Sequence, residues 1–187
     1  MSSSANNKRK PESTRTARNT RAGRPGPSET EREIRAALGD LDVDFDAFAV
    51  VSNVNRVSRA IRNYLEQNVL ATQQLSWSAF ATLFEIWIWG PMESQRLATQ
   101  VGITKATMTG VVDTLESRRL LVRKQDTDDK RVVLVSLTDH GRDVVSELFP
   151  VFNDQETTAT AGLSRAEMKT LASGLRTILN TLESDNR

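Results

Sequence analysis

Residues 104–109 combine a lysine with short hydroxyl and methyl side chains, a set that can bind nucleic acid. If the segment is a helix, its exposed face carries Lys105, Ala106, Thr107 and Thr109, with Thr104 as the N-cap. Hydroxyl and methyl groups can approach base edges in a major groove, and a lysine can reach guanine or a phosphate. Backbone amides at the helix N-terminus can bind a phosphate. Residues 110–114 add no cation, so this face is less basic than expected for a helix that reads DNA.

A second group of basic residues surrounds a polar turn over residues 125–130. Residues 120–124 and 131–137 alternate as two strands on either side of it, and Arg123, Lys130 and Arg131 are placed to contact DNA. An arginine at the tip of such a hairpin can enter a minor groove. Asp129 is predicted to orient Arg131 through a charged hydrogen bond rather than to touch DNA. A solvated hairpin is the alternative.

The residues before the first group predict the element that positions it. Ala98 is small where two helices would cross, and four residues later Gly102 can adopt the positive φ of a sharp turn. The apolar residues fall at the positions that such a pair of helices buries, namely Leu97, Val101, Ile103, Met108 and Val111. The pattern predicts a helix-turn-helix followed by a β-wing, with an ordinary helical hairpin as the alternative.

Composition excludes most other site chemistry. The absence of cysteine excludes disulfides, thiolate catalysis and iron–sulfur clusters, and the single histidine, His140, excludes sites that need two imidazoles. The alternating aspartates of residues 40–46 do not fit a calcium loop, because Phe45 and Val51 stand where glycine and glutamate are needed. The sequence contains neither a glycine-rich phosphate loop nor an activated nucleophile. We expect no enzyme, no cofactor and no metal site.

Charge is unevenly distributed, although Lys+Arg 25 and Asp+Glu 24 nearly balance. Residues 1–27 have a net charge of +6, and the other 160 residues have a net charge of −5. The basic segment has almost no large apolar side chains, so it is predicted to be a disordered tail. Its Gly23-Arg24-Pro25 resembles the core of minor-groove-binding peptides. The tail is interpreted either as an arm for a polyanion or as a solvated extension.

The residues before the helix-turn-helix predict further helices. Ser28 and Glu31 form a potential capping box for a short helix that Gly39 would close. Ser76 can cap a later helix that Gly90-Pro91 would stop. Apolar residues at spacings of 3 and 4 predict helices over residues 45–71, 77–89, 93–100 and 104–119.

Two more helices are predicted after the wing. Asp139 is expected to cap the first, which runs to about residue 160 and should kink at Pro150. Ser164 and Glu167 form a capping box for the second, whose apolar residues are spaced 3-4-3-4 to residue 182. The predicted fold is therefore mainly α with a small β-wing.

Three short motifs lie in and around the predicted wing. They are Leu115-Glu116 followed by Leu120-Leu121-Val122-Arg123, then Asp126 to Arg131 with its Asp-x-Arg, then Leu137-Thr138-Asp139-His140-Gly141. With these motifs, residues 45–183 resemble the MarR family (multiple antibiotic resistance regulators). The chain departs from the family at Arg119, which replaces a glycine, and at Gly110 and Thr114, where members often have arginine.

The resemblance implies an obligate homodimer in which terminal helices interlock and two winged helices read a palindrome. After the basic tail over 1–27, which lies outside the resemblance, the expected organisation is N-terminal dimerisation helices over 28–74, a winged helix-turn-helix domain over 75–138 and C-terminal dimerisation helices over 139–187. By this resemblance, small aromatic or phenolic anions would bind between the dimerisation helices and the winged helix. Candidate ligand-binding residues are Arg56, Trp77, Phe80 and Trp87. The alternative is that these aromatic side chains form core and that the arginine belongs to a solvated face.

These observations together predict a sequence-specific DNA-binding transcriptional regulator, a homodimeric repressor that a small molecule releases. Two other interpretations stay open: a winged-helix protein-interaction module, and an architectural DNA binder driven by the basic tail. No run of about 18 apolar residues is present, and residues 1–27 lack the apolar core of a secretory signal. A cytoplasmic location without membrane contact is expected.

Overall fold

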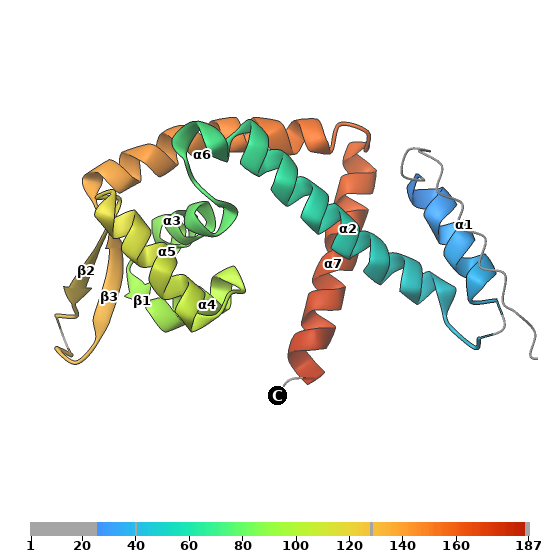
Figure 1. Ribbon diagram of the computed structural model, residues 1–187, viewed down its shortest axis with the longest axis horizontal. Helices are drawn as coiled ribbons and strands as arrows, with labels where there is room; N and C mark the ends of the chain where they lie inside the picture. The colour runs from blue at the N-terminus through green and yellow to red at the C-terminus, as the bar shows by residue number, and fades with distance from the viewer. Residues whose placement is uncertain (1–25, 40, 128, 186–187) are drawn as a thin grey trace, which may run out of the picture. The chain divides into compact units, whose positions relative to one another are not determined.

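The computed structural model describes residues 26–39, 41–127 and 129–185 (Figure 1). The described residues form seven α-helices, one short 3-10 helix and a three-stranded sheet. The tail predicted to be disordered lies outside them, apart from its last two residues. The chain divides into two compact units, residues 1–53 and 54–187. None of the described helices combines the length and apolar character that a bilayer crossing requires.

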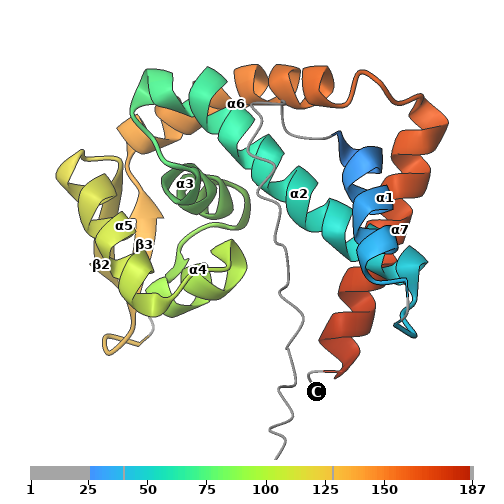
Figure 2. The same cartoon turned by 45° about the vertical axis from the view of Figure 1, so that its right-hand side comes forward.

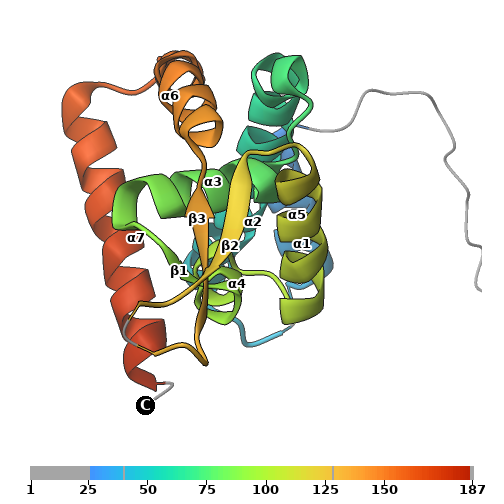
Figure 3. The same ribbon diagram turned by 90° about the vertical axis from the view of Figure 1, so that its left-hand side faces the viewer.

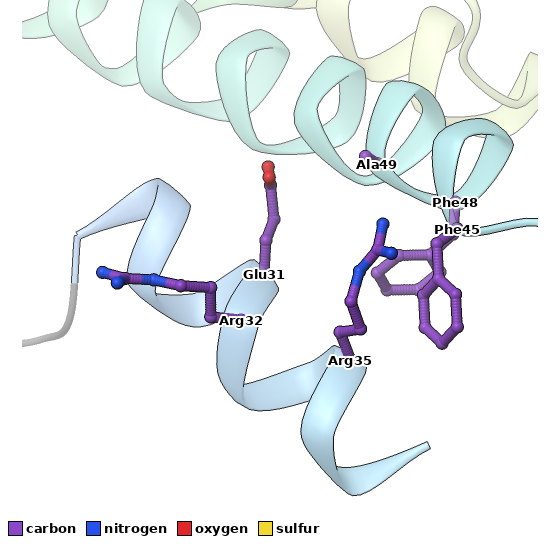
Figure 4. Close-up of a pocket in the computed structure, with 6 residues that line it drawn as sticks. All are labelled: Glu31, Arg32, Arg35, Phe45, Phe48 and Ala49. Atoms are coloured by element: carbon purple, nitrogen blue, oxygen red, sulfur yellow. The ribbon is translucent and has the colours of Figure 1, made fainter. Parts of the chain in front are cut away.

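The first unit contains α1 (Pro27–Ala37) and the start of α2 (Phe45–Asn68). The predicted Ser28 cap is wrong, because α1 begins one residue earlier: Gly26 is the N-cap, and Pro27 occupies the first turn, where its fixed φ suits a helix. Glu31 accepts a hydrogen bond from Asn53 Nδ2 at 2.5 Å instead of closing a capping box. Arg35 lies over the Phe45 ring, 4.6 Å from its centroid, beside a small pocket of 270 Å³ (Figure 4).

In the second unit, α2 ends at Asn68 and the 3-10 helix η1 (Leu70–Gln73) leads to α3 (Trp77–Trp89). Ser76 caps α3, as predicted, by accepting a hydrogen bond from the amide of Ala79 at 3.2 Å. The next elements are β1 (Met92–Glu93), α4 (Ser94–Val101) and α5 (Lys105–Ser117). Figure 2 shows α3, α4 and α5 gathered around one another.

The wing is the hairpin of β2 (Leu121–Gln125) and β3 (Val133–Leu137), whose antiparallel register pairs Leu121 with Leu137 and Arg123 with Val135. A third strand, β1, pairs with the other edge of β3, placing Met92 opposite Val135 (Figure 3). The sequence did not predict β1, because two residues are too short to show alternation. Its presence moves the start of α4 from residue 93 to Ser94.

The chain ends with α6 (Asp139–Ala159) and α7 (Arg165–Asp185). Asp139 was the wrong cap for α6: Thr138 is the N-cap, and its Oγ1 accepts a hydrogen bond from the amide of Gly141 at 2.9 Å. The helix continues through Pro150. The capping box at the start of α7 is confirmed, since Glu167 accepts from the Ser164 amide at 2.8 Å and Ser164 Oγ accepts from the Glu167 amide.

One hydrophobic core joins the end of α2, helices α3 to α6 and the sheet. Its least exposed members are Leu65, Leu70, Leu83, Leu97, Met108, Val112, Leu115, Val135 and Val145. By contrast, α7 contributes no buried residue, and its Leu171, Leu175 and Leu179 are 53%, 37% and 57% exposed. The core therefore holds the winged helix on α6, whereas α7 presents an apolar stripe to the outside of the single chain.

Candidate nucleic-acid interface and ligand cavity

The turn between α4 and α5 has the geometry predicted for a helix-turn-helix. Gly102 adopts φ +73°, and its amide donates to the carbonyl groups of Ala98 and Thr99, which ends α4. The Ile103 amide donates to the Ala98 carbonyl at 3.0 Å. Thr104 then caps α5 by accepting from the Thr107 amide at 3.1 Å. A side chain with a Cβ would be strained at residue 102, so the glycine fixes the angle at which α5 leaves the turn.

Helix α5 is anchored by one buried face and presents the other to solvent. Met108, Val112 and Leu115 are completely buried. The predicted DNA-contacting residues Thr104, Lys105, Ala106, Thr107 and Thr109 are all exposed. The structure thus places together, on one surface of α5, the side chains that the sequence selected for this role.

Two threonine hydroxyl groups of α5 donate their protons within the helix. Thr109 Oγ1 donates to the Lys105 carbonyl at 3.0 Å, and Thr114 Oγ1 donates to the Gly110 carbonyl at 2.8 Å. A hydroxyl used in this way keeps its lone pairs and its neighbouring methyl group for a ligand. Toward an external partner, Thr109 and Thr114 therefore offer hydrogen-bond acceptors and methyl groups, beside the ammonium of Lys105.

The wing arginine is held by an aspartate two residues earlier. Arg131 donates to Asp129 through Nε at 3.0 Å and through Nη2 at 2.8 Å, and the Arg131 amide also donates to Asp129 at 3.0 Å. These hydrogen bonds hold the pKa of the Asp129 carboxyl below its usual range. The Arg131 side chain stays 90% exposed. The predicted pairing is therefore present, and the remaining N–H groups of Arg131 are open to a partner.

Arg123, predicted to contact DNA, pairs with two carboxylates of α5. It donates to Asp113 at 2.6 Å and to Glu116 through its guanidinium, and its amide donates to Glu116 at 3.2 Å. Partial burial alone would lower the pKa of Arg123, but the two carboxylates outweigh it and raise this pKa. Arg123 therefore ties β2 to α5 and neutralises the acidic group that α5 exposes. The other basic wing residue, Lys130, is exposed beside the turn.

Arg118, which the sequence analysis did not select, fastens the end of α5 to the turn before α3. Its guanidinium donates to the carbonyl oxygens of Gln73 and Gln74 at 2.8 and 2.9 Å. These acceptors are backbone atoms more than forty residues earlier in the chain. No side-chain pattern in the sequence marks such a contact.

A cavity of 360 Å³ lies between α3, α4 and α6, and two of the candidate ligand-binding residues, Trp77 and Phe80, line it. Trp87 does not line it but packs against Phe84 and Phe149, with ring centroids 6.2 and 5.7 Å apart. Arg56, on α2, is half-buried and is not among the lining residues. The structure therefore places two of the three aromatic candidates at the cavity and leaves Trp87 and Arg56 outside its lining.

A larger apolar groove of 720 Å³ runs between α2, the end of α6 and α7. Its walls include Val57, Ile61 and Tyr64 from α2 and Met168 and Leu171 from α7. The Tyr64 hydroxyl donates to Gln155 of α6 at 2.6 Å, which ties two of these helices together. The groove and the exposed stripe of α7 form one continuous apolar region.

Comparison with known proteins agrees with this geometry. The MarR family model matches residues 75–133, from the turn before α3 to the wing. The HTH-type transcriptional regulator YwaE of Bacillus subtilis is 36% identical over 157 residues, which cover 82% of this chain and 92% of YwaE.

Two solved structures are similar as well. A probable transcriptional regulator from Pseudomonas aeruginosa has a TM-score of 0.63 and 26% identity, covering 69% of this chain and 96% of that one. BpsR of Bordetella bronchiseptica has a TM-score of 0.62 and 28% identity, covering 69% and 97%. The relatives are regulators rather than enzymes, as the sequence predicted. From the length of the match to YwaE and the winged helix described above, the chain belongs to the MarR family of DNA-binding helix-turn-helix transcriptional regulators.

Proposed function

We propose that the protein is a repressor that binds a palindromic operator as a homodimer and is released by a small aromatic molecule. The observation that carries the DNA-binding part is the outward face of α5 beside a wing arginine that Asp129 holds in an exposed position. In this proposal α5 enters a major groove and the wing follows the adjacent minor groove.

The polar groups of α5 favour a particular kind of readout. The Thr109 hydroxyl has donated its proton, so it acts as an acceptor for the amino group of adenine or cytosine. Ala106 and the threonine methyl groups suit contact with thymine methyl groups. Lys105 and Lys130 bind phosphates or guanine. Thr104 and Thr107 shape the N-terminal turn of α5, which faces the DNA backbone. Arg131 occupies the minor groove.

The exposed apolar residues of α7 support the dimer. A stripe of leucines at spacings of 3 and 4 is typical of a helix that packs on other helices. Large apolar patches on a soluble chain usually mark an interface. We propose that α7 and the groove beside α2 pack against the same elements of a second copy, which sets two α5 helices at the separation of successive major grooves.

The aromatic cavity supports control by a small molecule. Its 360 Å³ lies within the range of about 300–1,000 Å³ that ligand pockets occupy. DNA binding by BpsR, which is 28% identical, is regulated by 6-hydroxynicotinic acid. We propose that Trp77 and Phe80 contact the effector and that Trp87 supports the cavity wall from behind Phe84 and Phe149.

Selection of DNA from a random-sequence pool by the purified full chain, at low and high salt, tests the proposal. We expect enrichment of a palindrome of about 16–20 base pairs, bound by two chains in analytical ultracentrifugation. Binding only at low salt and without sequence preference would instead support an architectural binder, which the +6 tail favours. Failure to bind DNA at either salt would leave the protein-interaction module.

A further inference from the structure

We propose that the cavity between α3, α4 and α6 binds a small aromatic cation, such as a quaternary or protonated amine, rather than a phenolic or carboxylate anion. The inference rests on the proposed control by a small molecule and assigns the charge of that molecule.

Aromatic rings form much of the cavity wall. Five of the lining residues are Trp77, Phe80, Phe84, Phe149 and Phe152. The rings of Phe80 and Phe152 stack with centroids 4.4 Å apart, and those of Phe84 and Phe149 stack at 5.2 Å. Ring faces carry negative partial charge and attract a cation placed within about 6 Å of the centroid. In each stacked pair the facing surfaces cover each other, so only the outer faces of the rings are open to a ligand.

The charged groups of the wall have the same sign. Glu85 of α3 and Glu156 of α6 line the cavity, and both are half-buried. Glu156 Oε2 accepts from Asn153 at 2.9 Å, which leaves its Oε1 for a ligand. Among the described residues that line the cavity, none is arginine, lysine or histidine. A carboxylate ligand would meet two like charges in a partly desolvated site, whereas an ammonium group would find two counter-ions there.

The arginines of α2 do not supply the missing positive charge. Arg59 and Arg62 line a separate surface pocket, together with Asn55 and Ser58. The Arg62 guanidinium lies over the Trp77 ring, 5.5 Å from its centroid, without lining the cavity. Arg62 therefore takes one face of Trp77, so we expect the ammonium group of the ligand to lie toward Glu85 and Glu156 rather than at this ring.

Calorimetric titration of the full chain with three probes of similar size tests the charge. The probes are benzyltrimethylammonium, benzyl alcohol and phenylacetate. We expect benzyltrimethylammonium to bind at least tenfold more tightly than the other two. Glu85→Gln and Glu156→Gln should each weaken binding of the cation about fivefold or more and leave benzyl alcohol unchanged. Glu147→Gln, on the exposed side of α6, is the matched control and should change neither.

Three results would overturn the inference. They are tighter binding of phenylacetate, unchanged cation binding by both glutamine variants, and failure of the cation to bind the unaltered protein. DNA binding is measured on the same preparation without probes. If DNA is bound but the cation is not, only the ligand class fails. If the cation is bound but no operator is found, the proposed repressor function is rejected and the proposed cation site is retained.

Discussion

A Cβ atom on Gly141 would lie 2.0 Å from the carbonyl oxygen of Leu120, so the first turn of α6 packs directly on the backbone just before β2. The same carbonyl accepts from the Thr138 amide at 3.1 Å. Thr138 Oγ1 donates to the Arg119 carbonyl at 2.6 Å while it caps α6. The Leu-Thr-x-x-Gly motif is therefore a joint: the threonine ties the wing to α6, and the glycine allows the backbones to touch.

Gly141→Ala should lower the free energy of unfolding by about 2–3 kcal/mol, because the added methyl group must displace backbone rather than a flexible side chain. Gly110→Ala is the control, since nothing lies within 4 Å of its Cβ position inside α5. That variant should be more stable than the unaltered protein by about 0.5–1 kcal/mol. Urea unfolding measures both. Equal stability of Gly141→Ala and the unaltered protein would contradict the close approach.

The sequence predicted the parts of the fold that depend on nearby residues. The cap at Thr104 and the turn at Gly102 follow from spacings within twenty residues, and both are present. The buried face of α5 is confirmed in part: Met108 is buried as predicted, but Val111 is half-buried and Val112 and Leu115 complete the face. The same spacing identified Asp129 and Arg131 as a pair. Local patterns thus defined most of the surface that we propose to face DNA.

Features that depend on distant partners could not be predicted in this way. β1 exists only because β3 offers it an edge. The sequence did not show that Asp113 and Glu116 surround the guanidinium of Arg123. Arg119 replaces the family's glycine although it has φ +59°, a conformation that favours glycine. Tertiary pairing, not local propensity, decided the cases of β1 and Arg123.

Arg123→Gln should weaken operator binding by exposing the charge of Asp113 on the face of α5. It should also lower the free energy of unfolding by about 1 kcal/mol, the scale of a partly exposed ion pair. Asp113→Asn in the same chain should then restore most of the DNA affinity, because it removes the exposed charge. Fluorescence anisotropy of labelled operator DNA with the single and the double variant shows whether Arg123 neutralises Asp113 or contacts DNA itself. Absence of rescue would mean that Arg123 contacts DNA itself.

Arg131→Ala should weaken operator binding by about 1–3 kcal/mol, the scale of a lost specific contact. Asp129→Asn should weaken it less, because the arginine remains but loses its orientation. Hydrogen bonds from Arg131 depress the pKa of Asp129, so the pairing is present above the ordinary carboxyl pKa and is lost as pH falls through the depressed one. The difference in affinity between the protein and Asp129→Asn should therefore stay constant between about pH 5 and pH 8. Loss of that difference within this range would argue against the pairing.

Leu175→Glu should dissociate the proposed dimer. Leu175 belongs to the apolar stripe of α7 and lines the groove beside α2, so a carboxylate there would be buried in the interface. We expect dimerisation to weaken by about 2 kcal/mol or more, which is about 30-fold. Ser173→Glu, exposed on the same helix, is the matched control and should sediment as a dimer. Identical sedimentation of both variants would place the interface elsewhere.

Removal of residues 1–25 should reduce the salt dependence of operator binding without abolishing sequence preference. The segment holds seven basic residues and one acidic residue, and each phosphate contact that it makes contributes about 0.9 to the slope of log affinity against log salt. Replacing all seven basic residues by glutamine keeps the length of the tail and should reduce the slope equally. Arg24→Gln alone should reduce affinity mainly for operators with A·T-rich flanks, if the Gly-Arg-Pro segment reads a minor groove. An unchanged slope in the truncated protein would mean that the tail makes no phosphate contact and that all such contacts come from residues 26–187.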